Sequence, residues 1–469
     1  MAKKFYLTTT APYVNAEPHI GFALEIVQAD ALGRYRRLLG EKVAFGFGTD
    51  EHGVKIYRKA LEKKLAPQKY CDQSVVTWNQ LKQALNLSYT HFIRTTDPKH
   101  IQAAQELWRR CLKNGDIYKK FYKTKYCSGC ELEKTDSELV NAHCPLHPNL
   151  ALDLIEEENY FFRFSKFQKP LLEFYDRHPD FVIPQSRFQE IKTFVKSGLQ
   201  DFSLSRLTKK MPWGVPVPDD PNQVMYVWFD ALTFYLSNLG WPEDEKTFKE
   251  YWPVVQLAGK DNLRQQSAIW QAMLLSAGLP CSKQIFIHGF ITKDCQKISK
   301  SLGNTIDPLE LTKKYGTDAV RYYLLAKTHP FNDSDFTVKD FETSYNADLA
   351  NGLGNLVSRV AKLCQQDGLN GVKDFRKRTT VSTELDRYEF NQALVKLWEE
   401  LRKIDLDISQ FEPWKKINKE REEKLLNWAK RILEFAWQLQ IFLPQTAAKI
   451  EKIFSGKTIK IEQLLFPRL

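Results

Sequence analysis

The spacing of apolar positions changes along the first sixty residues, from strand-like runs to a helical repeat and back. Residues 5–10 form a β-rich apolar run, and a second run of this kind covers residues 42–47. Between these runs, apolar side chains from Gly21 to Leu39 recur at helical spacing, and Gly40 is typical of a helix end. This order predicts a strand, a helix and a second strand, and therefore a parallel sheet with functional residues at its strand ends.

The pattern changes twice further along the chain. Residues 118–210 hold short, interrupted aromatic segments that indicate an insertion, and parallel-sheet character returns at residues 224–229 and 284–291. From about Phe341 onward the pattern is almost entirely helical, which predicts a separate all-α domain. Its long amphipathic helices are expected over residues 386–404 and 420–442.

Composition favours folded domains over disorder. The chain has 469 residues, 43% of them hydrophobic and 13% aromatic, which suits about two to four domains. No apolar run approaches the roughly 18–20 residues of a membrane span, so no membrane association is expected. The N-terminus lacks the long apolar stretch of a secretory signal. We therefore expect a cytoplasmic protein whose 8 cysteines are thiols or metal ligands.

The chain is basic, with a formal net charge of +11. This excess favours a polyanionic partner, such as nucleic acid or a nucleotide. Because the excess is spread along the chain, charge alone does not distinguish such a partner from an ordinary protein with a high pI.

Two short motifs have the chemistry of phosphate binding. Pro18-His19-Ile20-Gly21 stands between the first expected strand and helix, where a glycine admits a phosphate to the helix N-terminus and His19 adds a donor. Lys297-Ile298-Ser299-Lys300-Ser301 forms a cationic loop after the last expected strand, suited to holding a transferring phosphate group. Each motif alone could be an ordinary solvated loop.

A cysteine and histidine cluster predicts a zinc site. Cys127 and Cys130 are followed, after 13 residues, by Cys144 and His147. Two such pairs at this separation match a tetrahedral zinc site, with His143 as an alternative ligand. Because four protein ligands leave no open position, the zinc would be structural and would hold the insertion together.

Taken together, the two phosphate motifs resemble the paired signatures of the class I aminoacyl-tRNA synthetases. The chain looks most like the methionyl-tRNA synthetase family, and the resemblance runs from about residue 5 to at least Trp414. The segments that carry it are residues 13–21 (YVNAEPHIG), 48–53 (GTDEHG), 212–218 (PWGVPVP), 226–231 (YVWFDA), 259–261 (GKD) and 288–290 (HGF). Zinc knuckles in the insertion are also implied by this resemblance.

The resemblance implies ATP-dependent attachment of methionine to its tRNA through methionyl-adenylate, with release of AMP and pyrophosphate and with Mg²⁺ accompanying ATP. The expected catalytic residues are His19, Lys297, Lys300 and Arg206, and the expected ATP contacts are His19, Gly21, Lys297, Lys300 and His288. The expected methionine pocket comprises Ala11, Tyr13, Asp50, Trp228, Ala231, Tyr235, Asn262, Gln266 and Trp270, with Asp50 holding the α-ammonium group. The expected anticodon readers are Asn355, Arg359 and Trp414.

These observations combine into one predicted architecture. We expect a Rossmann-type parallel-sheet catalytic domain with a zinc-knuckle insertion, followed by an all-α anticodon-binding helical bundle. The expected divisions are residues 1–117 and 213–292 for the two catalytic halves, 118–212 for the insertion, 293–340 for the KISKS loop and stem-contact segment, and 341–469 for the bundle. A monomer is expected.

The chain departs from the commoner family pattern at several positions. Phe22 stands where a second histidine is usual, which removes a potential phosphate or ribose donor. Ile298 replaces a methionine of similar volume. Ala11, Asn262 and Gln266 predict a roomier and more polar amino-acid pocket than usual.

Three other functions fit parts of the sequence. A catalytically impaired tRNA-binding paralogue would explain the loss of the second histidine, but it would not require His19, Asp50, Lys297 and Lys300. A class I synthetase for cysteine or for a branched aliphatic amino acid would need an early zinc-binding cysteine or a large editing insertion. A nucleotidyltransferase acting on a small acid would not need the helical domain.

Overall fold

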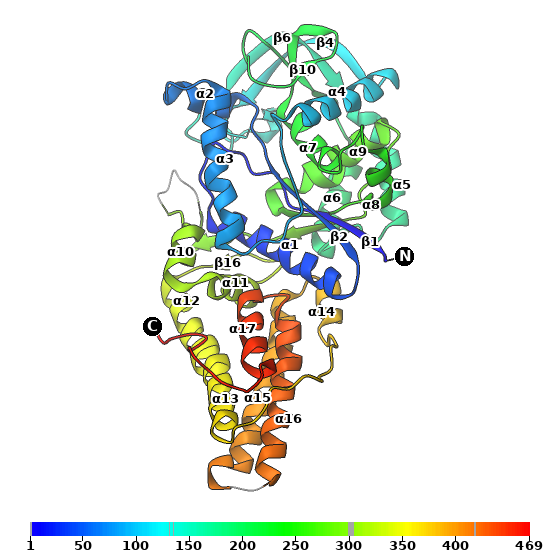
Figure 1. Ribbon diagram of the computed structural model, residues 1–469. Helices are drawn as coiled ribbons and strands as arrows, with labels where there is room; N and C mark the ends of the chain where they lie inside the picture. Colours follow the sequence, from blue (N-terminus) through cyan, green and yellow to red (C-terminus); the bar gives the residue numbers. More distant parts are fainter. Residues whose placement is uncertain (1, 131, 135, 299–303, 417–418) are drawn as a thin grey trace.

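A parallel sheet forms the centre of the N-terminal part of the molecule. The computed structural model describes residues 2–130, 132–134, 136–298, 304–416 and 419–469 (Figure 1). Within them the central sheet has the strand order β3-β2-β1-β12-β13-β7, with every neighbouring pair parallel. Its strands are β1 (Lys4–Thr8), β2 (Lys42–Thr49), β3 (His91–Arg94), β7 (Val182–Ile183), β12 (Val255–Gly259) and β13 (Gln284–His288). The predicted parallel sheet is confirmed.

Helices cover both faces of this sheet because alternate side chains of its strands point to opposite sides. In β1, Leu7 joins the core beneath one face and Tyr6 the core beneath the other. The first face is covered by α1 (Ile20–Leu38) and α11 (Thr317–Ala326), and the second by α4 (Pro98–Lys113), α7 (Val227–Ser237) and α9 (Trp270–Ser276). The result is a doubly wound α/β layer, as predicted.

Two antiparallel sheets lie at the upper end of the molecule in Figure 1; the first is built mainly by the expected insertion, whereas β10 and β11 of the second follow it in the sequence, beyond residue 212. One has the order β5-β4-β6-β8 and the other β10-β11-β9. Their strands are β4 (Ile117–Cys127), β5 (Leu132–Lys134), β6 (Asp153–Phe162), β8 (Phe202–Ser203), β9 (Ser205–Leu207), β10 (Pro216–Val217) and β11 (Asp220–Met225). The long β4–β6 hairpin carries the cysteine pairs at its far end.

Two details differ from the sequence-based expectation. Residues 224–229 are not a parallel strand, because β11 is antiparallel and α7 already begins at Val227. Both segments are apolar and buried, and a short apolar run does not distinguish a strand end from a helix start. In addition, β7 lies within residues 118–212 but pairs with β13, so part of the expected insertion belongs to the central sheet.

The C-terminal third is helical, as predicted. It contains α12 (Val338–Ser344), a π-helical segment η6 (Tyr345–Gly354), α13 (Asn355–Gln366), α14 (Ser382–Asp386), α15 (Phe390–Phe411), the short η7 (Pro413–Lys415), α16 (Lys419–Leu439) and α17 (Pro444–Ser455). The first long helix starts four residues later than expected because Tyr388 has a φ of 61°. The second ends at Leu439, shortly before Pro444 opens α17.

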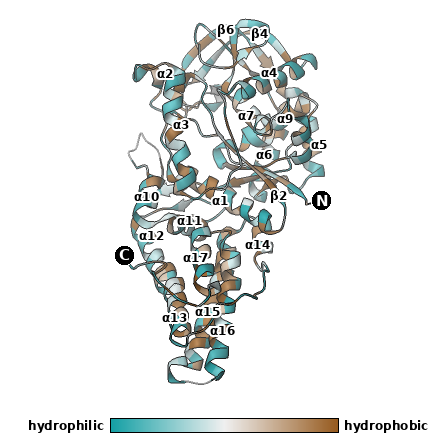
Figure 2. Cartoon of the chain, in the orientation of Figure 1, coloured by the Kyte–Doolittle hydropathy of each residue, from teal (hydrophilic) through white to brown (hydrophobic). Residues whose placement is uncertain are grey.

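The remaining elements connect these parts. They are α2 (Val54–Glu62), α3 (Pro67–Ala84), η1 (Asp136–Glu138), η2 (Phe164–Phe167), α5 (Gln168–Arg177), α6 (Gln185–Lys196), α8 (Glu245–Tyr251), η3 (Lys260–Asn262), η4 (Gln265–Ile269), β14 (Ile291–Lys293), β15 (Gln296–Lys297), α10 (Pro308–Tyr315) and β16 (Ser334–Asp335). Figure 2 shows apolar residues concentrated along the strands and on the inward sides of the helices. Among the residues that the structure describes, no helix is both long and apolar enough to cross a membrane.

The helical part shares its core with the catalytic part. One buried apolar cluster runs from Leu7 and Phe45 of the sheet to Leu397 of α15 and Leu433 of α16. The boundary expected near residue 341 is therefore crossed by continuous packing.

Candidate active site and metal centre

A cavity of about 610 Å³ opens at the carboxyl ends of β1 and β12. The strand order reverses between these two strands, which is where doubly wound sheets bind their ligands. The predicted residues that line it are Ala11, Tyr13, His19, Gly21, Asp50, Trp228, Ala231, Tyr235, Asn262, Gln266 and His288. The structure thus brings most of the predicted ATP and amino-acid residues into one space.

His19 is fixed at the start of α1 by a hydrogen bond of its own ring. It is the N-cap residue, and its Nδ1 accepts from the backbone N–H of Gly21 at 3.1 Å. A neutral imidazole that accepts at Nδ1 carries its proton on Nε2, where it can donate to a ligand. A side chain at position 21 would meet the His19 ring at 3.0 Å, so the glycine also leaves room for this cap.

Asp50 lies at the end of β2 and is held through its backbone. Its N–H donates to the carbonyl of Pro12 at 2.9 Å, and its carbonyl accepts from the N–H of Val14 at 3.1 Å. These bonds fix the main chain of Asp50, a residue that is 8% exposed, beside Tyr13 on the cavity wall. A buried carboxylate at a strand end is suited to an ammonium group.

Glu25 and His288 form a buried pair at the opposite wall. His288 Nε2 lies 2.9 Å from Glu25 Oε2, and Nδ1 lies 2.7 Å from the carbonyl of Gly289. Burial alone lowers the pKa of His288, but the Glu25 carboxylate and the Gly289 carbonyl outweigh it and raise the pKa above its usual value. Both ring nitrogens face acceptors, which favours the protonated form of the ring over the neutral one.

The inner end of the cavity is polar. Gln266 Nε2 donates to the Tyr235 hydroxyl at 2.5 Å, and Gln266 Oε1 accepts from Gln256 Nε2 at 2.8 Å. Gln266 belongs to the π-helical turn η4, a local irregularity often found at functional sites. The predicted greater polarity at this position is therefore visible in the structure, where the amide is held in a fixed orientation.

One residue of the expected methionine pocket lies outside the cavity lining, and the residue in place of the second histidine lies within it. Trp270 is fully buried and packs against Tyr235, with ring centroids 5.8 Å apart, but it is absent from the cavity lining. Phe22 does line the cavity, and its ring packs edge-on against Trp78 at 5.0 Å. Phe22 is thus an aromatic part of the wall where the usual second histidine would bring a donor.

Arg206 lies outside the main cavity. It projects from β9 into a separate cavity of about 260 Å³, between the rings of Tyr126 and Tyr226. Its Nη1 donates to the Ser203 hydroxyl and to the Ser205 carbonyl, each at 2.7 Å. Val227 lines both cavities and separates this arginine from the predicted ATP contacts.

The predicted lysine loop is only partly described. Lys297 ends β15, and Ile298 is buried and lines the main cavity, so the loop begins at the site. Lys300 lies outside the described residues, and the position of the Lys297 side chain is also outside them.

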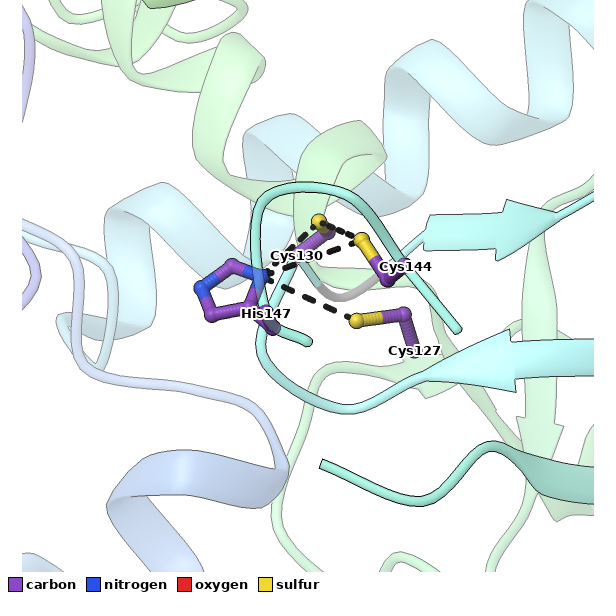
Figure 3. Close-up of side chains that lie close together, drawn as sticks. All are labelled: Cys127, Cys130, Cys144 and His147. Atoms are coloured by element: carbon purple, nitrogen blue, oxygen red, sulfur yellow. Dashed lines mark hydrogen bonds between the residues drawn. The ribbon is translucent and has the colours of Figure 1, made fainter. Parts of the chain in front are cut away.

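The four predicted metal ligands come together (Figure 3). The ligand atoms of Cys127, Cys130, Cys144 and His147 all lie within 4.8 Å of one another. Cys130 Sγ is 3.4 Å from Cys144 Sγ, and the three sulfurs lie 3.2–4.0 Å from His147 Nδ1. A tetrahedral zinc ion with the usual bond lengths needs ligand atoms about 3.5–3.8 Å apart. The donor set and its spacing therefore fit zinc.

The surrounding backbone is adapted to this cluster. A Cβ at Gly129 would lie 2.5 Å from the His147 ring, so only glycine allows the first knuckle to close. His143, the alternative ligand, instead contacts the Asn141 carbonyl through Nδ1 at 2.7 Å and is not part of the group. Cys130 also lines the main cavity, which places the metal centre against the active site.

The predicted anticodon residues lie in the helical bundle. Asn355 is exposed at the start of α13, and Arg359, one turn later, forms an ion pair with Asp405 of α15. Trp414 is 52% exposed in η7, between α15 and α16, at the end of the bundle farthest from the sheet (Figure 1). An exposed tryptophan at such a tip has a free face for stacking.

Sequence reasoning missed several residues around the site. Glu25 is one, although a glutamate within the apolar run of α1 is a detectable signal. A second is the buried Asp230, whose carboxylate lies between His52 and His100. These three residues are far apart in sequence, and only the fold brings them together.

Known proteins resemble the chain over most of its length. A family model described as tRNA synthetases class I (M) matches residues 5–151 and 133–361. The methionine--tRNA ligase of Synechocystis sp. is 42% identical over 95% of this chain and 88% of its own length. That of Thermosynechococcus vestitus is 49% identical over 77% of this chain and 69% of its own length.

Solved structures agree with these sequence relatives. Mycobacterium tuberculosis methionyl-tRNA synthetase in complex with methionyl-adenylate is 33% identical, with a TM-score of 0.93 over 99% of this chain and 100% of that one. The apo form of the same enzyme gives a TM-score of 0.85, with 30% identity over 100% of this chain and 99% of that one.

Proposed function

The chain belongs to the methionine-type class I tRNA synthetases, and from this membership we propose that it joins methionine to its tRNA through methionyl-adenylate. It is an aminoacyl-tRNA ligase. The observation that supports the assignment most strongly is the 610 Å³ cavity, in which the residues expected to bind ATP and methionine line one space at the reversal of the sheet.

In the first step, a carboxylate oxygen of methionine attacks the α-phosphorus of ATP and pyrophosphate leaves. We assign the α-ammonium group to Asp50, because its carboxylate is buried and held at a strand end. The phosphates belong at the N-terminus of α1, where the helix dipole, Gly21 and the Nε2–H of His19 favour negative charge. The buried His288–Glu25 pair is proposed to form the wall on the nucleotide side, where the ring is held in one orientation by Glu25 and the Gly289 carbonyl.

In the second step, a ribose hydroxyl at the tRNA 3′ end attacks the acyl carbonyl and AMP leaves.

Lys297 and Lys300 of the KISKS loop are proposed to neutralise the phosphates during activation, as the family resemblance implies. Arg206 does not line the main cavity, so we assign it to the neighbouring cavity and give it no direct contact with the reacting atoms.

The thioether of methionine belongs at the inner end of the cavity. Trp228, Ala231 and Tyr235 project from one face of α7 and form its wall. Because Gln266 holds the Tyr235 hydroxyl, this end is more polar than an aliphatic pocket, and branched aliphatic side chains are disfavoured there.

Two inorganic ions complete the proposal. The Cys127, Cys130, Cys144 and His147 group is proposed to hold a structural zinc ion, since its ligand spacing fits that metal. Zinc bound there stabilises the β4–β6 hairpin. Mg²⁺ is proposed to arrive with ATP as part of the substrate. A cytoplasmic location and a monomeric state stay predictions.

Amino-acid-dependent ATP–pyrophosphate exchange tests the activation step. We would offer methionine, cysteine, leucine, isoleucine and valine separately to the purified chain. Exchange stimulated by methionine alone is expected. Exchange with none of the five, together with tRNA binding, would instead identify a catalytically impaired tRNA-binding paralogue and contradict the proposal.

We further propose that Trp414 stacks on an anticodon base, because its side chain is exposed at the tip of the bundle. Trp414→Ala is expected to raise the KM for tRNA about tenfold, since one stacking contact is worth about 1–3 kcal/mol, and to leave pyrophosphate exchange unchanged. Trp414→Phe keeps a stacking face and should remain near wild type. Equal loss of exchange and charging in Trp414→Ala would place the residue in a structural role.

A further inference from the structure

A buried carboxylate behind the amino-acid pocket has no role in the reaction described above. Asp230 is 0% exposed and sits in the first turn of α7. Its Oδ2 lies 2.7 Å from His52 Nδ1, and its Oδ1 lies 2.8 Å from His100 Nε2. His100 is fully buried too, and its Nδ1 lies 2.8 Å from the Ser237 hydroxyl at the end of α7.

The hydrogen bonds have a consistent direction. His100 donates from Nε2, because the Asp230 carboxylate oxygen accepts, and its Nδ1 lies against the Ser237 hydroxyl, which itself donates to the Phe234 carbonyl at 3.3 Å. His52 donates from Nδ1 to the other carboxylate oxygen. Burial alone raises the pKa of Asp230, but the charge of His52 and the hydrogen bonds from both histidines outweigh it and bring the pKa to about 2. The carboxylate is therefore ionised, with both oxygens engaged.

The network joins three segments that carry different parts of the site. His52 follows Asp50, the proposed anchor of the α-ammonium group, by two residues. His100 belongs to α4, which packs against α7. Asp230 belongs to α7, but Trp228, Ala231 and Tyr235 occupy the helix face that lines the cavity, whereas Asp230 lies on the opposite face.

Further contacts join the residues after Asp50 into one segment with Trp213, and the bond from His52 ties that segment to Asp230. The His52 ring packs edge-on against Trp213 at 5.4 Å. Trp213 Nε1 donates to the Glu51 carbonyl at 2.6 Å, and its own carbonyl accepts from the Gly53 N–H at 3.2 Å. A rigid segment of this loop is thus attached to α7 through the Asp230 carboxylate.

We propose that Asp230 is a positioning residue for methionine, because with His52 and His100 it fixes the Asp50 loop at a set distance from the α7 wall of the side-chain pocket. An apolar residue would fill the same space, but it would not set the orientation of two imidazoles. Buried polar networks with every member satisfied specify one arrangement of their elements in this way. The inference rests on the proposed function, which assigns the cavity to methionine.

The test is Asp230→Asn in pyrophosphate exchange. The amide keeps the shape but replaces one acceptor by a donor, so one histidine loses its partner. A lost buried hydrogen bond of about 1–3 kcal/mol predicts a KM for methionine raised about tenfold, with the KM for ATP within about twofold of wild type. Asp318→Asn is the matched control, because Asp318 is another buried carboxylate, which accepts from the Thr446 N–H at 2.6 Å in the helical part.

His52 variants provide a second test that does not depend on the folding of Asp230→Asn. His52→Asn places an amide N–H near the position of Nδ1, whereas His52→Ala removes the donor. We expect His52→Asn to keep the KM for methionine within about threefold of wild type and His52→Ala to raise it about tenfold.

Three outcomes would overturn the inference. They are an unchanged KM for methionine in both Asp230→Asn and His52→Ala, an equal rise of the ATP and methionine KM values, and a rise as large in Asp318→Asn. Failure of the proposed function is distinguishable, because the wild-type chain itself would then lack methionine-dependent exchange.

Discussion

His288 and Glu25 show how single residues set the charge of the site. The histidine is buried, and both of its ring nitrogens face acceptors. The protonated ring is therefore favoured, and its charge is compensated by the Glu25 carboxylate, so the two residues form a buried ion pair on the cavity wall. Phe22 contributes no charge, because its side chain is a phenyl ring. The ring packs against Trp78 and Phe47 and forms part of the cavity wall.

The raised pKa of His288 predicts a pH dependence of stability. A pKa that is higher in the folded than in the unfolded chain stabilises the protein below the unfolded value, and this stabilisation is lost as pH rises through the folded value. We expect the Tm difference between the wild type and His288→Gln to narrow from about pH 6 to about pH 9.

The control for this prediction is His178→Gln, at an exposed histidine. Its Tm difference from the wild type should not change with pH over that range. A constant Tm difference for His288→Gln would contradict a raised pKa of His288 in the folded protein.

Sequence motifs that adjoin strand ends lie together in the structure. His19, Gly21, Asp50 and His288 all line the cavity, because the carboxyl ends of parallel strands meet at one edge. Their roles stay predictions, and Arg206 and Trp270 are not among the lining residues. Their distance from the cavity depends on the packing of β9 and of the turn η4, which no local pattern encodes.

Among the elements, the β4–β6 hairpin depends most on a few side chains. Many of its outward positions are exposed, as at Phe121 and Leu154, so the hairpin has little core of its own. The zinc ligands sit where the chain leaves β4, and their spacing predicts that a metal takes the place of a core there.

Metal removal should therefore affect this element first. We expect about one zinc ion per chain by elemental analysis and, after chelation, faster hydrogen exchange in residues 117–162 than in the central sheet. Cys144→Ser should lose the zinc, whereas Cys281→Ser, at a cysteine outside the cluster, should keep it. Protein purified without zinc would refute the assignment.

Element boundaries were predictable from the sequence only where the period was unambiguous. The long helix α1 and the strands β1 and β2 match their patterns within a few residues. The apolar run at residues 224–229 was misread because β11 and α7 are both buried and meet within it. Strand β7 has only two residues, which is too few to show a strand periodicity. Its pairing with β13 in the central sheet could therefore not be predicted from the sequence.

At the scale of the whole molecule, one buried arginine joins the sheet part to the helical part. Arg321 of α11 lies 2.8 Å from Asp30 of α1, and both side chains are fully buried. The same guanidinium donates to the carbonyls of Leu85, at 3.0 Å, and Phe442, at 2.7 Å. Segments from both ends of the chain therefore meet at a single side chain.

Arg321→Met should destabilise the molecule as a whole. Breaking a buried pair leaves an uncompensated charge and costs about 3–5 kcal/mol. We expect a clear fall in the Tm of the variant. We also expect tRNA binding to change the rate of pyrophosphate exchange less in the variant than in the wild type. Arg187→Met, which removes a partly exposed pair with Glu190, is the control and should cost less than about 1 kcal/mol. Similar Tm values for the two variants would contradict a central role for Arg321.

The apolar core that runs without interruption from the sheet into α15 and α16 also limits how such a molecule can be taken apart. Amino-acid activation and tRNA reading are separate tasks, but the parts of the chain that carry them share one buried core. A gene fragment cut near codon 341 would encode the described residues that line the cavity and would leave an apolar surface uncovered. Separating the two tasks by such a cut would therefore expose side chains that the intact molecule buries.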